Sequence, residues 1–275
     1  MAHLTLGLIQ TDPNEDKQAN VNSAIKLIGE AATAGAQFVA LPETFHCRGP
    51  NEVKFATAEP IPGPLSTRLG EVALQHGIYL LAGSYNERVD DGDPRLFNTS
   101  LLFDPHGTAV AKYRKIHLFD VVIDGQVKAQ ESSRNRPGDQ IVTAKTDYGT
   151  VGLSICYDLR FPEVYRALAL RGATLTFVPS NFTLYTGKDH WEPLLRARAI
   201  ENGMYIVAPA TIGGGGGGFT AYGRSLVVDP WGTVLACAPD QVGVTLVTID
   251  LNRVQKVRES LPSLAHRRPD VYTDT

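Results

Sequence analysis

The chain has 275 residues, of which 43% are hydrophobic, and its formal net charge is −3. A chain of this length can bury a substantial core, and the small negative charge gives no basic field that would attract nucleic acid or an anionic membrane surface. We therefore expect a globular protein that binds neither nucleic acid nor a membrane.

The N-terminal residues lack the basic segment, long apolar run and cleavage site of an export signal. No apolar run approaches the roughly 20 residues that a membrane-spanning helix needs. Three widely separated cysteines, Cys47, Cys156 and Cys237, fit free thiols in a reducing compartment better than a disulfide framework. We expect a cytoplasmic protein. Because CxxC and HExxH patterns are missing, we expect no metal and no cofactor.

Short apolar runs alternate with amphipathic segments in the first third of the chain. Residues 4–10 predict a buried strand and residues 16–34 a helix. Further strands are expected over 38–41 and 78–83, with a helix between them that begins after the Pro-Gly-Pro turn at 62–64. This βαβαβ order is typical of α/β proteins.

Two later segments, 101–112 and 226–236, place a Pro-x-Gly turn between extended runs and so predict hairpins. Hairpins imply antiparallel strands within a mixed sheet. Between them the alternation resumes, with strands over 150–156, 175–179 and 205–208 and helices over 162–172 and 189–203. We expect one α/β domain over residues 1–275, built as a sandwich of two mixed sheets with helices outside.

Six consecutive glycines over 213–218 predict a mobile loop between strands. A phosphate-binding loop is the alternative, but it would need a helix after the glycines. The residues that follow, 219–228, look like a strand instead. We therefore prefer the mobile loop.

Cys156 ends an apolar run just before a charged helix start, a setting that lifts a side chain onto the rim of a sheet. Glu43 also follows a strand, and Lys115 lies in a basic patch. Taken singly, Cys156 could be a core thiol or a metal ligand. Glu43 could be a solvated acid, and Lys115 could be an ordinary surface lysine. Together they supply the nucleophile, the proton carrier and the oxyanion cation that amide hydrolysis by a thiol requires. A nearby lysine would also lower the pKa of the thiol.

Three blocks resemble the signature blocks of the nitrilase superfamily: Leu41–Glu43, Tyr113–His117 and Ile155–Glu163. The resemblance continues in order over nearly the whole chain, through residues 179–182, 186–192, 195–202, 229–232 and 266–272. It implies a four-layer α-β-β-α sandwich and a catalytic triad of Glu43, Lys115 and Cys156. By position, Glu131 is a second glutamate that would hold Lys115 and substrate by hydrogen bonds.

Within this family the chain is most similar to the branch of omega-amidases and deaminated-glutathione amidases, which act on amides of dicarboxylate-like compounds. Such a substrate carries a carboxylate remote from its amide, so the pocket should offer a cation and a hydroxyl. Arg160 is the candidate clamp, Phe182 the pocket wall and Thr186 the hydroxyl donor, while the backbone N–H of Tyr157 would complete the oxyanion site. Alternatively, Arg160 is structural and pairs with Asp158 or Glu163.

Several alternatives stay open at this stage. Nitrilases, carbamoylases and aliphatic amidases would use the same triad, and an idle scaffold or a metal-dependent hydrolase is also conceivable. His117 and His190 lack a third orienting group and are not expected to act as the base. His46 and Cys47 are expected to pack and to lie on the pocket rim, and not to bind a metal. The resemblance further implies homo-oligomers, with residues 261–275 packing across a subunit interface.

Overall fold

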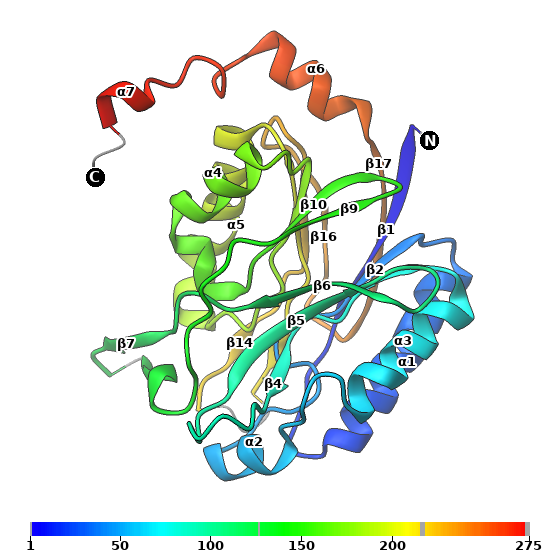
Figure 1. The fold of residues 1–275 in the computed structure, drawn as a ribbon, viewed down its shortest axis with the longest axis vertical. Helices are drawn as coiled ribbons and strands as arrows, with labels where there is room; N and C mark the ends of the chain where they lie inside the picture. The colour runs from blue at the N-terminus through cyan, green and yellow to red at the C-terminus, as the bar shows by residue number, and fades with distance from the viewer. Residues whose placement is uncertain (1, 126, 215–217, 273–275) are drawn as a thin grey trace.

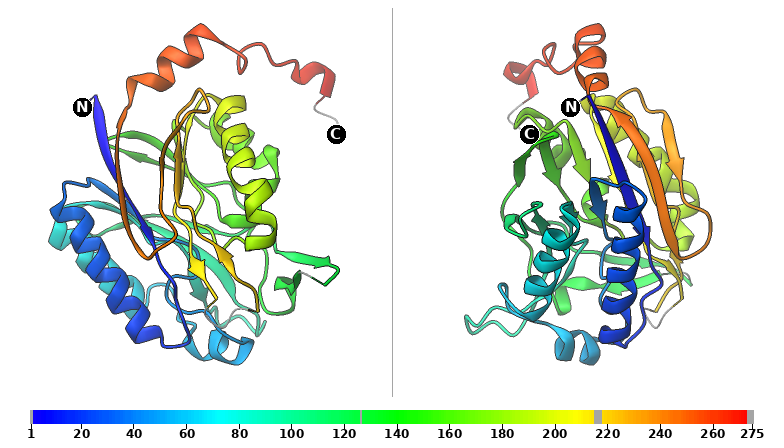
Figure 2. Two further views of the ribbon diagram at one scale, coloured as in Figure 1. Left: turned by 180° about the vertical axis from the view of Figure 1, so that it is seen from behind. Right: turned by 90° about the vertical axis from the view of Figure 1, so that its right-hand side faces the viewer.

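The computed structural model describes residues 2–125, 127–214 and 218–272. Two β-sheets pack face to face, and helices cover both outer faces (Figures 1 and 2). The predicted four-layer α-β-β-α arrangement of two mixed sheets is confirmed. Among the described helices, none combines the length and apolar character that crossing a bilayer requires.

The first sheet has seven strands over the described residues, and its parallel centre is β1, β2 and β3. Its order is β17 (Gly243–Asp250), β1 (His3–Gln10), β2 (Phe38–Ala40), β3 (Tyr79–Leu81), β5 (Phe97–Phe103) and β4 (Tyr85–Glu87), with β6 (Ala109–Arg114) also paired to β5. Helices α1 (Lys17–Thr33) and α3 (Pro64–His76) lie on its outer face.

The second sheet has six strands in the described chain, with β10, β11 and β12 parallel at its centre. Its order is β16 (Val234–Cys237), β15 (Leu226–Val228), β12 (Tyr205–Ala208), β11 (Leu175–Phe177), β10 (Gly149–Leu153) and β9 (Thr143–Thr146). Helices α4 (Pro162–Leu170) and α5 (Leu184–Asn202) cover its outer face.

The remaining elements are short and lie outside the two sheets. They are α2 (Asn51–Thr57), α6 (Asn252–Ser260), α7 (Pro269–Tyr272), the 3₁₀ turns η1 (Glu131–Ser133) and η2 (Cys156–Arg160), and two ribbons, β7 (Asp120–Ile123) with β8 (Val127–Gln130) and β13 (Ile212–Gly213) with β14 (Ala221–Tyr222). The β7–β8 ribbon projects from the body of the molecule, and α7 lies beyond α6 at one end (Figure 1).

The main core lies between the sheets and under α4 and α5. Phe38 of the first sheet and Phe177 of the second pack with ring centroids 4.7 Å apart. A second core fills the space between the first sheet and α1 and α3, where Ile28 and Leu69 are fully buried. Two apolar layers of this kind fix the sheets relative to each other, and with them the loops at the strand ends.

Most predicted elements are confirmed. The differences concern where particular strands and helices begin, end or break. β10 ends at Leu153, so Cys156 opens a 3₁₀ turn instead of ending the strand. Residues 219–228 form two strands, because Gly223 and Arg224 take left-handed backbone angles between them. Helix α5 begins at Leu184, five positions before the expected start at residue 189, because Thr183 caps it by accepting from Thr186. Half of the predicted mobile loop, residues 215–217, lies outside the described residues, and Gly213 at its start ends β13.

Candidate active site

A cavity of about 550 Å³ opens beside the ends of strands from both sheets. Glu43 lies shortly after β2, Lys115 directly after β6 and Cys156 shortly after β10. Glu131 begins η1, after the β7–β8 ribbon. All four side chains line the cavity and are almost completely buried. The fold therefore brings together the four residues that the sequence singled out as a catalytic set.

The turn that carries Cys156 is strained and tightly held. Cys156 has a φ of 45°, in the left-handed region that non-glycine residues seldom adopt. Its N–H donates to the Pro179 carbonyl at 3.1 Å. Two residues later, the fully buried Asp158 accepts from the Ile155 N–H at 2.9 Å. These bonds fix the turn so that the thiol points into the cavity instead of into the core.

Asp158 also ties this turn to the segment that carries the lysine. It accepts hydrogen bonds from the Tyr113 hydroxyl at 2.6 Å and from the His117 N–H at 3.0 Å. The His117 Nδ1 lies 2.8 Å from the same carboxylate, and its ring stacks on Phe161. Asp158 thus orients the His117 ring, so the expectation that no group would orient it is wrong. His117 nevertheless does not line the cavity and is not placed to act as a base there.

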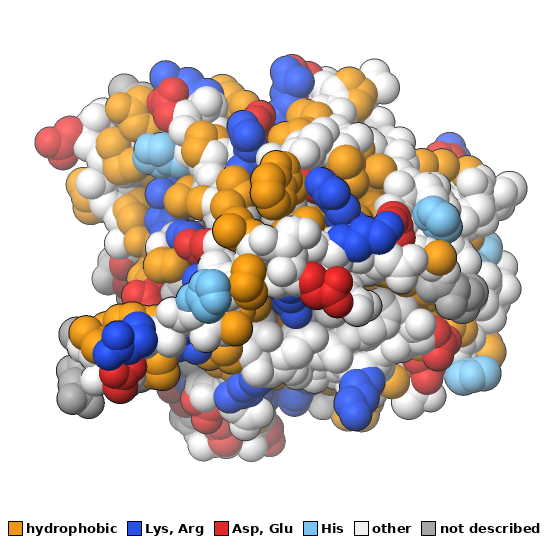
Figure 3. Space-filling model, turned by 90° about the horizontal axis from the view of Figure 1, so that it is seen from above, with side chains coloured by type: hydrophobic (Ala, Val, Ile, Leu, Met, Phe, Trp, Pro, Cys, Tyr) orange, Lys and Arg blue, Asp and Glu red, His pale blue; other side chains and the backbone are white. Residues whose placement is uncertain are grey.

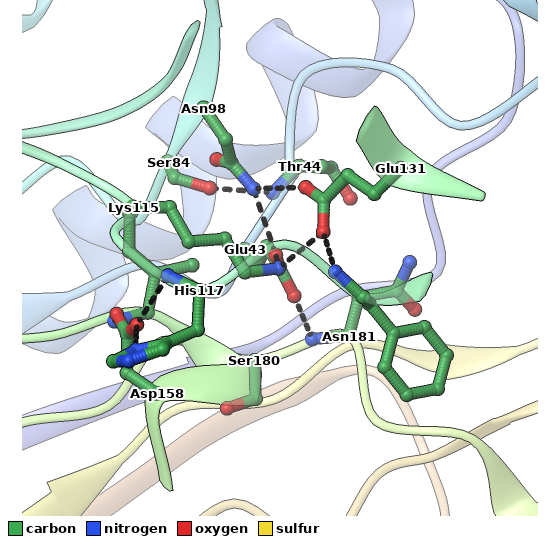
Figure 4. A network of polar contacts seen from close by, with 12 residues as sticks. Glu43, Thr44, Ser84, Asn98, Lys115, His117, Glu131, Asp158, Ser180 and Asn181 are labelled. Atoms are coloured by element: carbon green, nitrogen blue, oxygen red, sulfur yellow. Dashed lines mark hydrogen bonds and ion pairs between the residues drawn. The ribbon is translucent and has the colours of Figure 1, made fainter. Parts of the chain in front are cut away.

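Lys115 lies between two carboxylates (Figure 4). Its Nζ is 2.9 Å from Glu43 Oε1 and 2.9 Å from Glu131 Oε2. Asn98 of β5 donates from Nδ2 to Glu43 at 2.8 Å and to Glu131 at 3.4 Å. The other Glu43 oxygen accepts from the Asn181 N–H at 2.7 Å. This network fixes Glu43 beside the thiol.

Glu131 has further partners that hold it at the lysine. The Phe119 N–H donates to its Oε2 at 2.8 Å and Asn135 Nδ2 to its Oε1 at 3.1 Å. Burial opposes the charged form of Glu131, but Lys115 and the Phe119 N–H outweigh burial and lower its pKa. Burial likewise opposes the charge on Lys115, yet Glu131 and Glu43 raise its pKa well above the usual value. Glu131 and Lys115 therefore carry opposite charges at neutral pH.

The pKa of Cys156 is set by opposing effects. Lys115 lowers it, as expected, but burial and then the charge on Glu43 raise it, so that it lies well above its usual value. The lysine does not offset burial, because its charge is balanced by Glu43 and Glu131, each 2.9 Å away. Cys156 is therefore a neutral thiol at rest, and it needs a base to become a nucleophile.

The three predicted substrate residues also line the cavity. The Cζ atom of the Arg160 guanidinium lies 5.3 Å from the centroid of the Phe182 ring. The Nη1 atom of Arg160 lies 3.3 Å from His190 Nδ1. The Thr186 hydroxyl is 2.8 Å from the Thr183 hydroxyl. The oxygens of Asp158 are occupied by other donors, and no ion pair joins Arg160 to an acid among the described residues. The purely structural alternative for Arg160 thus receives no support.

The sequence missed the asparagines that hold the carboxylates, Asn98 and Asn135. Asn98 begins a run of three polar residues, 98–100, inside β5, and this polar run within a strand was the available signal. His46 and Cys47 pack in the interior as expected, but neither lines the cavity, so their predicted place on its rim is wrong.

Over residues 2–125, 127–214 and 218–272, no group of three or more His, Cys, Asp or Glu side chains is placed to hold a metal ion.

Comparison with known proteins agrees with this geometry. A model of the carbon-nitrogen hydrolase family matches residues 5–259. The chain belongs to the carbon-nitrogen hydrolase family. Omega-amidase NIT2 of Homo sapiens is 42% identical to this carbon-nitrogen hydrolase over 274 residues, which cover 99% of this chain and 98% of the human protein. Deaminated glutathione amidase of Mus musculus is 42% identical over 272 residues, covering 97% of this chain and 84% of the mouse protein.

The crystal structure of the C. elegans NitFhit protein superposes on this carbon-nitrogen hydrolase with a TM-score of 0.90 at 38% identity. The match covers 99% of this chain and 66% of that one, so NitFhit contains a large part without a counterpart here. The predicted family, fold class and enzyme class, a carbon-nitrogen hydrolase, are confirmed.

Proposed function

We propose that this carbon-nitrogen hydrolase is an amidase that cleaves the amide of a small dicarboxylate-like molecule through a thioester on Cys156. The observation that carries the proposal is the position of Glu43, which bridges Lys115 and the Asn181 N–H beside the Cys156 thiol in one cavity. The names of the human and mouse relatives, an omega-amidase and a deaminated glutathione amidase, support this reaction class.

In the first half-reaction, Glu43 takes the proton of the Cys156 thiol as the sulfur adds to the amide carbon. The Lys115 ammonium and the Tyr157 N–H stabilise the oxyanion that forms on the former carbonyl oxygen. Protonated Glu43 then gives its proton to the amide nitrogen, the C–N bond breaks, and ammonia leaves. A thioester remains on Cys156.

In the second half-reaction Glu43 again accepts a proton first and donates it afterwards. Glu43 takes a proton from water as the water oxygen adds to the thioester carbon, and the same oxyanion site is used again. The C–S bond breaks, the sulfur regains its proton from Glu43, and the carboxylic acid leaves. Glu131 keeps Lys115 charged and in place throughout.

The carboxylate of the substrate would bind at Arg160. This guanidinium has no acidic partner among the described residues, and it packs over Phe182, so it presents an unpaired positive charge to the cavity. Thr186 lies on the same wall and offers a hydroxyl. A nitrile, a carbamoyl compound or an aliphatic amide would need the same triad but not this cation.

The proposal is tested with Cys156→Ala and the substrates succinamate, butyramide and 3-cyanopropanoate. We expect ammonia release from succinamate by the parent enzyme, at least about tenfold less from butyramide because the Arg160 contact is lost, and little from the nitrile. Mass spectrometry of quenched enzyme should find a succinyl adduct on Cys156. Normal turnover by a folded Cys156→Ala variant would refute the mechanism, and equal rates on butyramide would refute the role of Arg160.

We also propose that the chain forms homo-oligomers, with residues 261–275 at the interface. Trp231, Leu261 and Ile200 are about half-exposed, and they line a groove beside the end of α6. Figure 3 views the end of the molecule that carries α6 and α7, where hydrophobic side chains lie in patches among lysines and arginines. Such exposed apolar area is typical of subunit interfaces. Light scattering on the parent and on Trp231→Glu would test the assembly, since the variant should dissociate.

A cytoplasmic location is proposed as well. All three cysteines are free, including the exposed Cys237, which suits a reducing compartment. Cell fractionation with an antibody against the chain would test it, and recovery in a secreted fraction would refute it.

A further inference from the structure

Arg48 is a buried arginine in the wall of the cavity, in the segment between β2 and α2. Only 1% of this residue is exposed. Asp12 Oδ1 lies 3.7 Å from its Nη1, which is too far for a hydrogen bond, and 42% of the Asp12 side chain is exposed. Burial lowers the pKa of Arg48, and Asp12 offsets this effect only in part. The guanidinium therefore depends on partners other than an acid.

Those partners are backbone carbonyl groups at two places in the chain. Nη1 donates to the oxygens of Gly213 at 3.0 Å and Ile212 at 3.4 Å, at the end of β13. Nη2 donates to the oxygen of Phe219 at 2.6 Å, shortly before β14. The planar guanidinium carries donors on separate nitrogens, so it can bind both places at once. Arg48 thus ties the end of β13 to the segment that leads into β14.

The backbone at Gly213 is shaped for this contact. Gly213 has a φ of 83°, in the left-handed region that favours glycine. A Cβ atom at this position would clash with the Asp12 carboxylate. Any other residue would therefore push β13 away from Asp12, and with it the carbonyl groups that Arg48 binds.

Phe219 depends on Arg48 for its position. The next residue, Thr220, is held by another bond, because its carbonyl oxygen accepts from the Leu184 N–H at 2.7 Å. Phe219 lies beyond that bond, and Arg48 binds its carbonyl oxygen. The Cζ atom of Arg48 also lies 5.4 Å from the centroid of the Phe219 ring. Since Phe219 lines the cavity, Arg48 sets where this aromatic wall stands.

The wall at Phe219 adjoins the residues proposed to bind the acyl part of the substrate. The Tyr222 N–H donates to the Phe182 carbonyl oxygen at 2.8 Å, so the strand after Phe219 runs beside the segment that carries Phe182. Phe182, Thr186 and Phe219 all line the cavity. A displaced Phe219 would widen the cavity on this side and weaken the binding of a small substrate.

The catalytic groups are held by other bonds. The Thr211 N–H donates to the Ser180 oxygen at 2.9 Å, and the Thr211 hydroxyl donates to Asn181 Oδ1 at 2.7 Å. Asn181 in turn binds Glu43 through its N–H. Arg48 takes no part in these bonds, so its loss should leave Glu43 in place beside the thiol.

We propose that Arg48 is a positioning residue that acts through Phe219. By binding the carbonyl groups of Gly213 and Phe219, it fixes the aromatic wall beside the acyl part of the substrate. It thereby sets the affinity for substrate without touching the reacting atoms. This inference rests on the proposed function, because it assumes that a small dicarboxylate-like amide binds along this wall.

Steady-state kinetics of succinamate hydrolysis test the inference. Arg48→Gln removes the guanidinium, so we expect KM to rise about tenfold or more while kcat changes less than about threefold, because the wall moves and the catalytic groups do not. Arg48→Lys keeps a positive charge beside Asp12 but cannot bind both carbonyl groups as the planar guanidinium does. It should also raise KM, and it replaces Arg48→Gln if that variant does not fold.

A double-mutant cycle with Phe219→Ala shows whether Arg48 acts through the wall. Phe219→Ala removes the ring and should raise KM about as much as Arg48→Gln does. In the Phe219→Ala background, Arg48→Gln should change KM by less than about twofold, because the ring that it positions is already gone. Two independent effects would multiply instead.

Arg258 of α6 provides a matched control. It also donates to three backbone carbonyl oxygens, those of Gly203 at 3.0 Å, Ala173 at 2.7 Å and Asn202 at 3.2 Å. It does not line the active-site cavity. Arg258→Gln should lower the unfolding temperature, as Arg48→Gln does, but it should leave KM unchanged.

The outcomes separate this inference from the proposed function. An unchanged KM in the Arg48 variants, equal increases in Arg48→Gln and Arg258→Gln, or effects that multiply in the cycle would overturn the role of Arg48 alone. A parent enzyme that does not hydrolyse succinamate and forms no adduct on Cys156 would overturn the proposed function, and this inference with it.

Discussion

The Tyr113 hydroxyl donates a 2.6 Å hydrogen bond to the fully buried carboxylate of Asp158. Tyr113 lies in β6, two residues before Lys115, and Asp158 lies in η2, two residues after Cys156. This bond therefore joins the segment that carries the cation to the turn that carries the thiol, across the interface between the two sheets. It sets how far apart the two groups can lie.

We predict that Tyr113→Phe lowers kcat by about tenfold or more while KM changes little, because Lys115 and the Cys156 turn lose a charge-assisted bond that fixes their separation. The matched control is Tyr165→Phe. Tyr165 is equally buried, and its hydroxyl lies 3.0 Å from the Ser154 hydroxyl instead of contacting Asp158. Both variants should unfold at a lower temperature, but only Tyr113→Phe should lose activity. Equal loss in both would mean that general destabilisation is responsible.

The raised pKa of Cys156 predicts slow alkylation at neutral pH, because the thiolate is the reactive form. The rate of iodoacetamide labelling of Cys156, followed by peptide mass spectrometry, should rise with pH and continue to rise above pH 9. Glu131→Gln removes one negative charge from the cluster, so it should lower the pKa of the thiol and accelerate labelling at pH 8. A labelling rate that levels off below pH 7 would contradict the neutral resting thiol.

Asn98 donates to both Glu43 and Glu131, so we predict that its lack of charge matters as well as its shape. Asn98→Asp places a third carboxylate next to Glu43 and Glu131, which raises their pKa values by mutual repulsion. The acidic limb of the kcat/KM profile should move to higher pH by about one unit or more. Asn135→Asp is the comparator, because Asn135 contacts only Glu131, and its shift should be smaller. An unmoved limb in Asn98→Asp would show that Asn98 does not position Glu43.

Buried His46 predicts a loss of stability in acid. Burial, aided by Lys17, lowers the pKa of His46 from its usual value of 6.5 to about 3. Below pH 6.5 the unfolded chain therefore binds a proton that the folded protein does not, so the free energy of unfolding falls as pH falls, until about pH 3. The expected slope from this residue is about 1.4 kcal/mol per pH unit.

Urea denaturation of the parent and of His46→Gln at several values between pH 5 and 6.5 would measure this slope. In this window Glu131 and other acids with lowered pKa values are ionised in both the folded and the unfolded state, and they contribute little. The variant is expected to be less stable overall but to depend less on pH. Parallel curves for the two proteins would argue against a neutral buried His46.

The sequence by itself determined the family, the α/β class and most of the elements. Strands and helices follow from the spacing of apolar residues over a few positions, as in α1, where buried Val21, Ala24 and Ile28 follow the cap at Asp16. The blocks around Glu43, Lys115 and Cys156 could be found because each is a short local pattern. The single-domain organisation and the oligomer stay predictions.

Tertiary structure alone decided what these residues do to each other. The two glutamates that neutralise Lys115 are 72 and 16 positions away from it in the chain, so no local pattern could reveal that Cys156 is a neutral thiol. Charges act through distance in space, whereas sequence patterns record distance along the chain.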